Sequence, residues 1–151
     1  MTLFDFSQQI GKLKKDKKYH EALSFFKENK TGFSREQIAG NEYIISDMLT
    51  CLRKSSLNEA GFKFLNYYGL DIKADTKERV LSSYGWLLWS QYKAENEILH
   101  TPEEDYHFED EEDDSEIQDF HYTKTELLEK IEVTIKLCLL YTSPSPRDRT
   151  R

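Results

Sequence analysis

The chain contains little cysteine, proline or glycine. Its 151 residues include only two cysteines, three prolines and six glycines. Two cysteines exclude a disulfide framework and a multi-cysteine zinc site. No apolar run approaches the roughly 18 residues of a membrane span, and the first residues lack the basic and apolar regions of a signal peptide. We therefore expect one cytoplasmic domain held together by its hydrophobic core.

Basic residues are missing from one long interval. The chain has 28 acidic and 21 basic residues, a net charge of −7, which argues against a general binder of nucleic acid or anionic membranes. No Lys or Arg occurs between Lys93 and Lys124, and this interval contains the acidic run Glu109–Asp114. Because such a segment cannot build a packed core, we predict an acidic loop over 97–122 that is solvated or disordered.

Three histidines lie in the predicted acidic loop, where they could join carboxylates in binding a metal ion. Imidazole and carboxylate groups suit zinc, but the spacing of the histidines matches no zinc motif. The acidic run also lacks the glycine and the bidentate Glu of a calcium-binding hand. We expect solvated side chains, no metal and no cofactor, although the ligand types are present at His100, His107 and His121.

Apolar spacing predicts six helices arranged as three hairpins. In the first helix, Leu3, Phe6 and Ile10 recur at three and four residues. Ser34 and Gln37 form a capping-box pattern that opens a longer third helix. The predicted helices cover about 2–15, 19–29, 34–52, 57–68, 77–96 and 123–137.

Tyr19, Ala22 and Phe26 place a small residue between two bulky ones on one helical stripe, and Ala60 and Phe64 repeat part of this pattern. Over about residues 2–100 the chain resembles tetratricopeptide repeats (TPRs), although Lys17 replaces the turn glycine of the family. The resemblance implies an all-α, right-handed stack of about three helical hairpins whose first helices line a protein-binding groove.

A second resemblance is narrower. The segment 83–89, with two tryptophans, resembles the N-terminal helical part of large prokaryotic conflict-system proteins that carry S1 or cold-shock-like modules. It implies an alternative function, association with nucleic acid in a defence protein.

The end of the chain breaks the preceding patterns. Residues 138–148 read CLLYTSPSPRD and resemble the translation of a common transposase-type sequencing adapter. The competing interpretation is a disordered Ser/Pro-rich tail. We expect the natural gene to be cut near Leu137, which divides the chain into a helical domain at 2–96, an acidic loop at 97–122, a truncated helix at 123–137 and a non-native tail at 138–151.

The residue types favour binding over catalysis. No phosphate-binding glycine loop, nucleophile elbow or paired-carboxylate pattern occurs. We therefore predict a non-catalytic protein-interaction module whose partner is a protein or peptide, with no membrane partner. The tryptophans are candidates for core residues or for exposed anchors. The predicted partner contacts are Gln9, Asn41, Tyr43, Trp86, Trp89 and Gln91, and the residues of the alternative nucleic-acid contact are Lys12, Lys14, Lys15, Lys17 and Lys18.

Overall fold

The computed structural model describes residues 1–70, 72, 76–97 and 122–142. All regular secondary structure in this part of the chain is helical, which confirms the predicted all-α class. The α-helices are α1 (Leu3–Lys15), α2 (Tyr19–Asn29), α3 (Arg35–Ala39), α4 (Glu42–Lys54), α5 (Asn58–Tyr67), α6 (Glu78–Glu97) and α7 (Lys124–Thr142), and a short 3-10 helix, η1, covers Lys30–Gly32.

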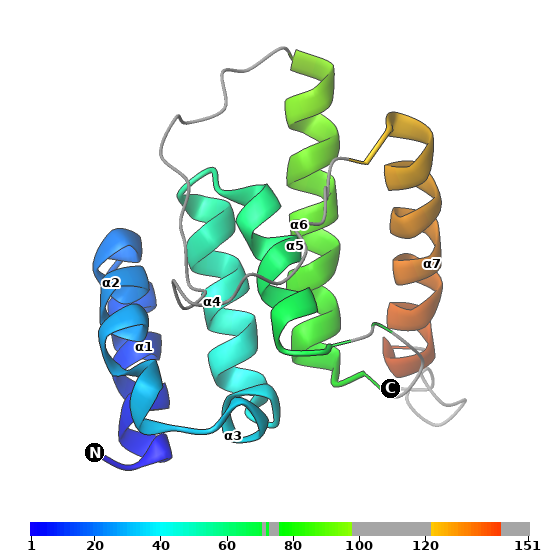
Figure 1. The fold of residues 1–151 in the computed structure, drawn as a ribbon. Helices are drawn as coiled ribbons and strands as arrows, with labels where there is room; N and C mark the ends of the chain where they lie inside the picture. The colour runs from blue at the N-terminus through cyan, green and yellow to red at the C-terminus, as the bar shows by residue number, and fades with distance from the viewer. Residues whose placement is uncertain (71, 73–75, 98–121, 143–151) are drawn as a thin grey trace, which may run out of the picture.

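The long helices form a row of three antiparallel pairs. Figure 1 shows α1, α4 and α6 running in one direction and α2, α5 and α7 running back. Each of α2, α5 and α7 packs against the helix that precedes it in its pair, and α4 also packs against both α1 and α6. The first helices of the three pairs, α1, α4 and α6, therefore form one continuous layer, and the candidate site lies along this layer.

The helix predicted over 34–52 is wrong as a single element. The capping box is present, since the Ser34 hydroxyl accepts from the Gln37 N–H, but it opens only the five-residue helix α3. At Asn41 the backbone is extended, and the side-chain oxygen accepts from the N–H groups of Tyr43 and Ile44 at 3.1 and 3.0 Å. This second cap starts α4 in a new direction, because Asn satisfies the donors that a continuous helix would have bonded internally.

The first two hairpin turns share one backbone geometry. Lys17 has a φ of 61° and Ser56 a φ of 60°, in the left-handed region that glycine adopts most easily. In each turn the next residue donates its N–H to a carbonyl five positions earlier, over 2.8 Å, as Lys18 does to Leu13. Lys17 therefore adopts the left-handed turn conformation without a glycine at this position.

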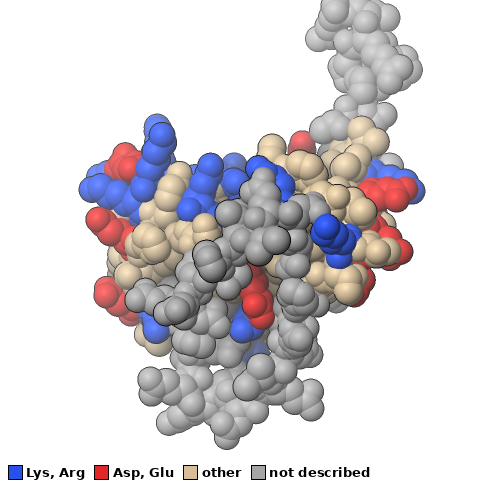
Figure 2. All heavy atoms as spheres, turned by 90° about the horizontal axis from the view of Figure 1, so that it is seen from above, with Lys and Arg blue, Asp and Glu red and all other residues tan. Residues whose placement is uncertain are grey.

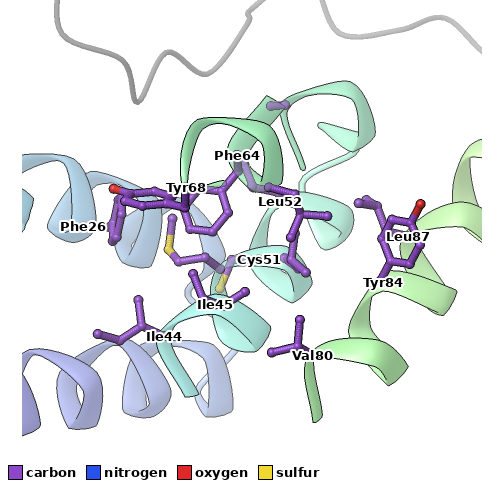
Figure 3. Packing of buried hydrophobic residues seen from close by; sticks show 14 of the residues in the cluster. Phe26, Ile44, Ile45, Cys51, Leu52, Phe64, Tyr68, Val80, Tyr84 and Leu87 are labelled. Atoms are coloured by element: carbon purple, nitrogen blue, oxygen red, sulfur yellow. The ribbon is translucent and has the colours of Figure 1, made fainter. Parts of the chain in front are cut away.

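The core is rich in aromatic rings that bridge the hairpins. Phe6 stacks on Phe26 with ring centroids 5.7 Å apart, and Phe26 lies 5.6 Å from Phe64 in the second pair. Figure 3 shows Phe26, Phe64 and Tyr68 grouped beside the aliphatic side chains of α4. Ala22, the small residue of the predicted stripe, is fully buried. The first and second hairpins thus share one hydrophobic core.

The third pair closes the row. Thr123 and Glu126 form the reciprocal cap of α7, and Leu127 is fully buried. The helix extends beyond the predicted end at Leu137 to Thr142, and residues 143–151 lie outside the described part, as do residues 98–121 of the predicted acidic loop. The face of α7 that the described residues leave uncovered mixes charged side chains, such as Glu129, Glu132 and Lys136, with the exposed apolar residues Leu128, Val133, Ile135 and Leu139. Among the described helices, none combines the length and hydropathy required to cross a bilayer.

Candidate functional groove

A broad groove of about 1150 Å³ lies against the layer formed by α1, α4 and the start of α6. Most of its lining comes from α1, including the strongly exposed ring of Phe4. The lining mixes aromatic rings, amides and charges: Leu3, Phe4, Asp5, Ser7, Gln8, Gln9, Gly11, Lys12, Lys15, Asn41, Tyr43, Asp47 and Arg79. Such a composition suits recognition of a peptide, which presents both backbone amides and side chains.

A buried carboxylate links the three helices of this layer. The Asp47 side chain on α4 is only 5% exposed, and its Oδ1 accepts from Lys14 Nζ on α1 over 2.7 Å. Arg79 Nη2 on α6 lies 3.7 Å from the same oxygen. Since burying an unpaired charge costs several kcal/mol, both cations stabilise the carboxylate where it lies. Asp47 therefore fixes the positions of a cation from each neighbouring helix.

Gly11 allows α1 to approach this carboxylate. A Cβ atom at position 11 would lie 3.3 Å from Asp47 Oδ2, closer than most real Cβ contacts. The missing side chain keeps the space beside Asp47 open on the α1 side. The same glycine lines the groove, so the floor of the groove is backbone at this point.

Two arginines lie over aromatic rings at the seam between α4 and α6. The Arg79 guanidinium carbon is 4.9 Å from the centre of the Tyr43 ring, and Arg79 Nε donates to Ser46 Oγ over 2.9 Å. Further along the seam, the Arg53 guanidinium carbon is 5.7 Å from the centre of the Trp86 ring. Partial burial lowers the pKa of Arg53. Each guanidinium is thus held on a ring face and partly removed from water.

The structure brings three of the six predicted partner contacts together. Gln9, Asn41 and Tyr43 all line the groove. Trp86 lies under Arg53 at the seam and does not line the groove. The remaining two, Trp89 and Gln91, lie on α6 outside the groove lining.

The interpretation of the tryptophans as core residues is wrong. Trp86 is 57% exposed and Trp89 is 42% exposed, while Leu87 and Leu88 between them are fully buried. Trp89 stacks on Tyr92 with ring centroids 5.7 Å apart. Because α4 and α7 already cover two sides of α6, its tryptophans fall on the part of its circumference that faces outward.

The lysines of the predicted nucleic-acid contact form a lysine corner that divides into two groups, and its members are Lys12, Lys14, Lys15, Lys17 and Lys18. Lys12 and Lys15 line the groove, and Lys14 pairs with Asp47. Lys17 and Lys18 are exposed in the α1–α2 turn. Figure 2, seen from above, shows Lys and Arg side chains gathered on the side where α1 and α2 lie in Figure 1. One part of the corner is therefore contiguous with the groove.

Among the described residues, the His, Cys, Asp and Glu side chains are the groups suited to holding a metal ion, and Cys is also a potential nucleophile. Within that part of the chain, no group of three or more His, Cys, Asp or Glu side chains could hold a metal ion. His100, His107 and His121 lie outside it. The Cys51 thiol is fully buried, and burial raises its pKa to about 12, with the nearby Asp47 charge acting in the same direction. A thiol in that state is a poor nucleophile at neutral pH.

Sequence reasoning missed the residues that organise the seam, Asp47, Arg53 and Arg79. One signal was present, because Asp47 is a charged residue flanked by the apolar pairs at 44–45 and 48–49. A charge at such a position needs a partner from another element. The identity of the partners depends on how helices far apart in sequence stack, which the local pattern does not contain.

Comparison with protein-family models, with curated proteins and with solved structures finds no match to this chain.

Proposed function

We propose that the chain is a non-catalytic protein-interaction module of the cytoplasm that binds a peptide segment of its partner across α1, α4 and α6. The groove carries this proposal. It is concave, extends over three helices and offers exposed rings, amide groups and charges on one continuous surface. Peptide recognition uses this combination, with a few exposed anchors surrounded by polar groups that fix orientation.

A TPR-like stack is the architecture that we propose for the module. Lys14 and Asp47 are separated by 33 residues, and so are Ser46 and Arg79. Because both contacts join residues 33 positions apart, α1 packs against α4 in the same register as α4 packs against α6. The interval is close to the roughly 34 residues of a TPR. This register supports a repeat whose first helices form the binding layer.

The test is selection from a displayed library of random peptides with the intact chain as bait. Peptides that bind should lose affinity when Tyr43→Ala removes a ring from the groove. They should bind normally to Glu28→Ala, which removes an exposed side chain of α2 that does not line the groove. Failure to enrich any peptide, or enrichment of peptides that ignore the Tyr43 change, would contradict the proposed function.

Nucleic-acid binding through the lysine corner is the second candidate. It is favoured by the exposed Lys15, Lys17 and Lys18 around the α1–α2 turn. Phosphate contacts would make the affinity fall steeply with salt. A labelled single-stranded oligonucleotide and a duplex should then bind the intact chain, and a variant with Gln at Lys14, Lys15, Lys17 and Lys18 should bind weakly. If the variant binds as well as the parent, or if neither binds, this candidate is eliminated.

A further inference from the structure

The seam between α4 and α6 presents two guanidinium groups at a defined separation. Arg79 lies at the level of Ser46 on α4, and Arg53 lies at the level of Trp86 on α6. Both Ser46 to Arg53 and Arg79 to Trp86 span seven residues of helix. At ~1.5 Å of rise per residue, these two levels are about 10 Å apart along the seam.

Both groups are arranged to meet carboxylates. A guanidinium that lies over a ring still has N–H donors at its planar edge, and a carboxylate can accept hydrogen bonds from them. Its five donors allow Arg79 to contact Ser46 and Asp47 and still donate to a ligand. The rings of Tyr43 and Trp86 hold the arginines in place, which lowers the conformational entropy lost on binding.

The spacing between the levels of Arg79 and Arg53 fits one extended backbone conformation of a peptide ligand better than the other. In a polyproline II helix, which has three residues per turn and a rise of ~3.1 Å, side chains at i and i+3 lie on the same side and about 9 Å apart. In a β-strand, side chains on one face recur every two residues, at about 7 Å and then 13 Å. Of these two extended conformations, polyproline II comes closer to the separation of the two arginine levels.

We infer that the seam binds an acidic peptide in the polyproline II conformation, with two Glu or Asp side chains three residues apart contacting Arg79 and Arg53. This inference rests on the proposed function, and it extends the ligand from the groove, which Arg79 lines, to Arg53 beyond the groove lining. A peptide fits better than a nucleic acid, because the arginines already cover faces of Tyr43 and Trp86 that bases would need for stacking. The net charge of −7 also opposes a polyanion more than a ligand with two local charges.

The experiment measures fluorescence anisotropy of labelled peptides with the full chain. The probes are four short peptides of the same length that contain Glu-Pro-Pro-Glu, Glu-Pro-Glu, Gln-Pro-Pro-Gln or a scrambled order. We expect Glu-Pro-Pro-Glu to bind at least about tenfold more tightly than the Gln peptide, in line with two charge-assisted contacts. It should also bind more tightly than Glu-Pro-Glu, and the advantage should shrink at high salt.

Variants of the chain assign the two contacts. Arg79→Gln and Arg53→Gln should each weaken binding of Glu-Pro-Pro-Glu by about tenfold and should leave the Gln peptide unaffected. Lys27→Gln makes the same charge change on an exposed part of α2 outside the groove lining and should have no effect. Because Arg79 also contacts Asp47, circular dichroism melts verify its folding, while Arg53→Gln and the peptide substitutions leave that carboxylate intact.

Three outcomes would overturn the inference: equal binding of the Glu and Gln peptides, a preference for Glu-Pro-Glu, or tighter binding of a short single-stranded oligonucleotide than of any peptide. The proposed function fails separately. If library peptides without acidic residues bind and respond to Tyr43→Ala, the interaction module stands and the acidic ligand is wrong. If no library peptide binds, the groove is not a general peptide site and the proposed function fails; binding of Glu-Pro-Pro-Glu that Arg79→Gln and Arg53→Gln weaken would then be a property of the seam alone.

Discussion

The buried carboxylate of Asp47 gives a quantitative prediction about how the three first helices are held together. Asp47→Asn keeps the shape of the side chain and removes its charge. Breaking a fully buried ion pair costs about 3–5 kcal/mol, whereas exposed pairs contribute about 0–1 kcal/mol. Here the Asp47 side chain is 5% exposed, but Lys14 is 28% and Arg79 is 45% exposed. Because both cations can regain water, we expect a loss of roughly 1–2 kcal/mol.

Thermal unfolding followed by circular dichroism measures this loss. For a chain of this size it corresponds to a decrease in Tm of roughly 2–8 °C. Glu59→Gln is the control. Glu59 is half exposed, and its Oε1 atom lies 3.9 Å from Lys63 Nζ, which makes a weak surface ion pair, so the Tm of this variant should change little. A double-mutant cycle of Lys14→Met with Asp47→Asn should give a coupling free energy of about 1 kcal/mol. An Asn variant as stable as the parent, or a coupling near zero, would refute the view that this carboxylate joins α1 to α4.

Three further predictions concern packing, protonation and capping. Gly61→Ala places a Cβ 2.8 Å from a terminal carbon of the fully buried Leu87, so overpacking should exceed the gain in helix propensity and lower stability by about 1 kcal/mol. Gly32→Ala meets nothing within 4 Å, and an equal loss there would contradict that explanation. Because burial raises the pKa of Cys51 from 9.0 to about 12, the unfolded state loses this proton first as pH rises, and the free energy of unfolding should fall above pH 9. Urea titrations at pH 8 and 10 should show a drop larger by about 1 kcal/mol in the parent than in Cys51→Ala, and equal drops would exclude this group as the cause. Asn41→Ala removes the cap of α4 and should cost about 1 kcal/mol in urea unfolding, and an unchanged midpoint would show that the cap contributes nothing.

Much of the fold could be predicted from local patterns. The helix predicted at 19–29 matches α2, and the helix predicted at 57–68 overlaps α5, which is followed by Gly69 with a φ of 65°, a conformation that commonly ends helices. These boundaries depend on residues next to each other in sequence. The break between α3 and α4 was missed because Gly40 and Asn41 lie inside a continuous apolar pattern, and periodicity alone does not detect a cap within it.

The candidate site was predictable only in part, for a similar reason. Gln9, Asn41 and Tyr43 were found because polar or aromatic residues at exposed positions of the first helices suggest contacts. Arg53 and Arg79 were missed because each acquires its role from an aromatic residue more than 30 positions away. Such pairs depend on the register in which helices stack, and that register is set by the packing of the whole layer.

The central position of α4 affects how the molecule opens. Because α1, α2, α3, α5 and α6 all contact α4, while α7 rests on α6, either end of the row can separate by local unfolding without loss of the middle. A ligand that spans α1, α4 and α6 would join both ends to the centre. Binding would then slow amide hydrogen exchange in α1 and α6 together, so that two independent opening events become one cooperative event without any change in the position of the backbone.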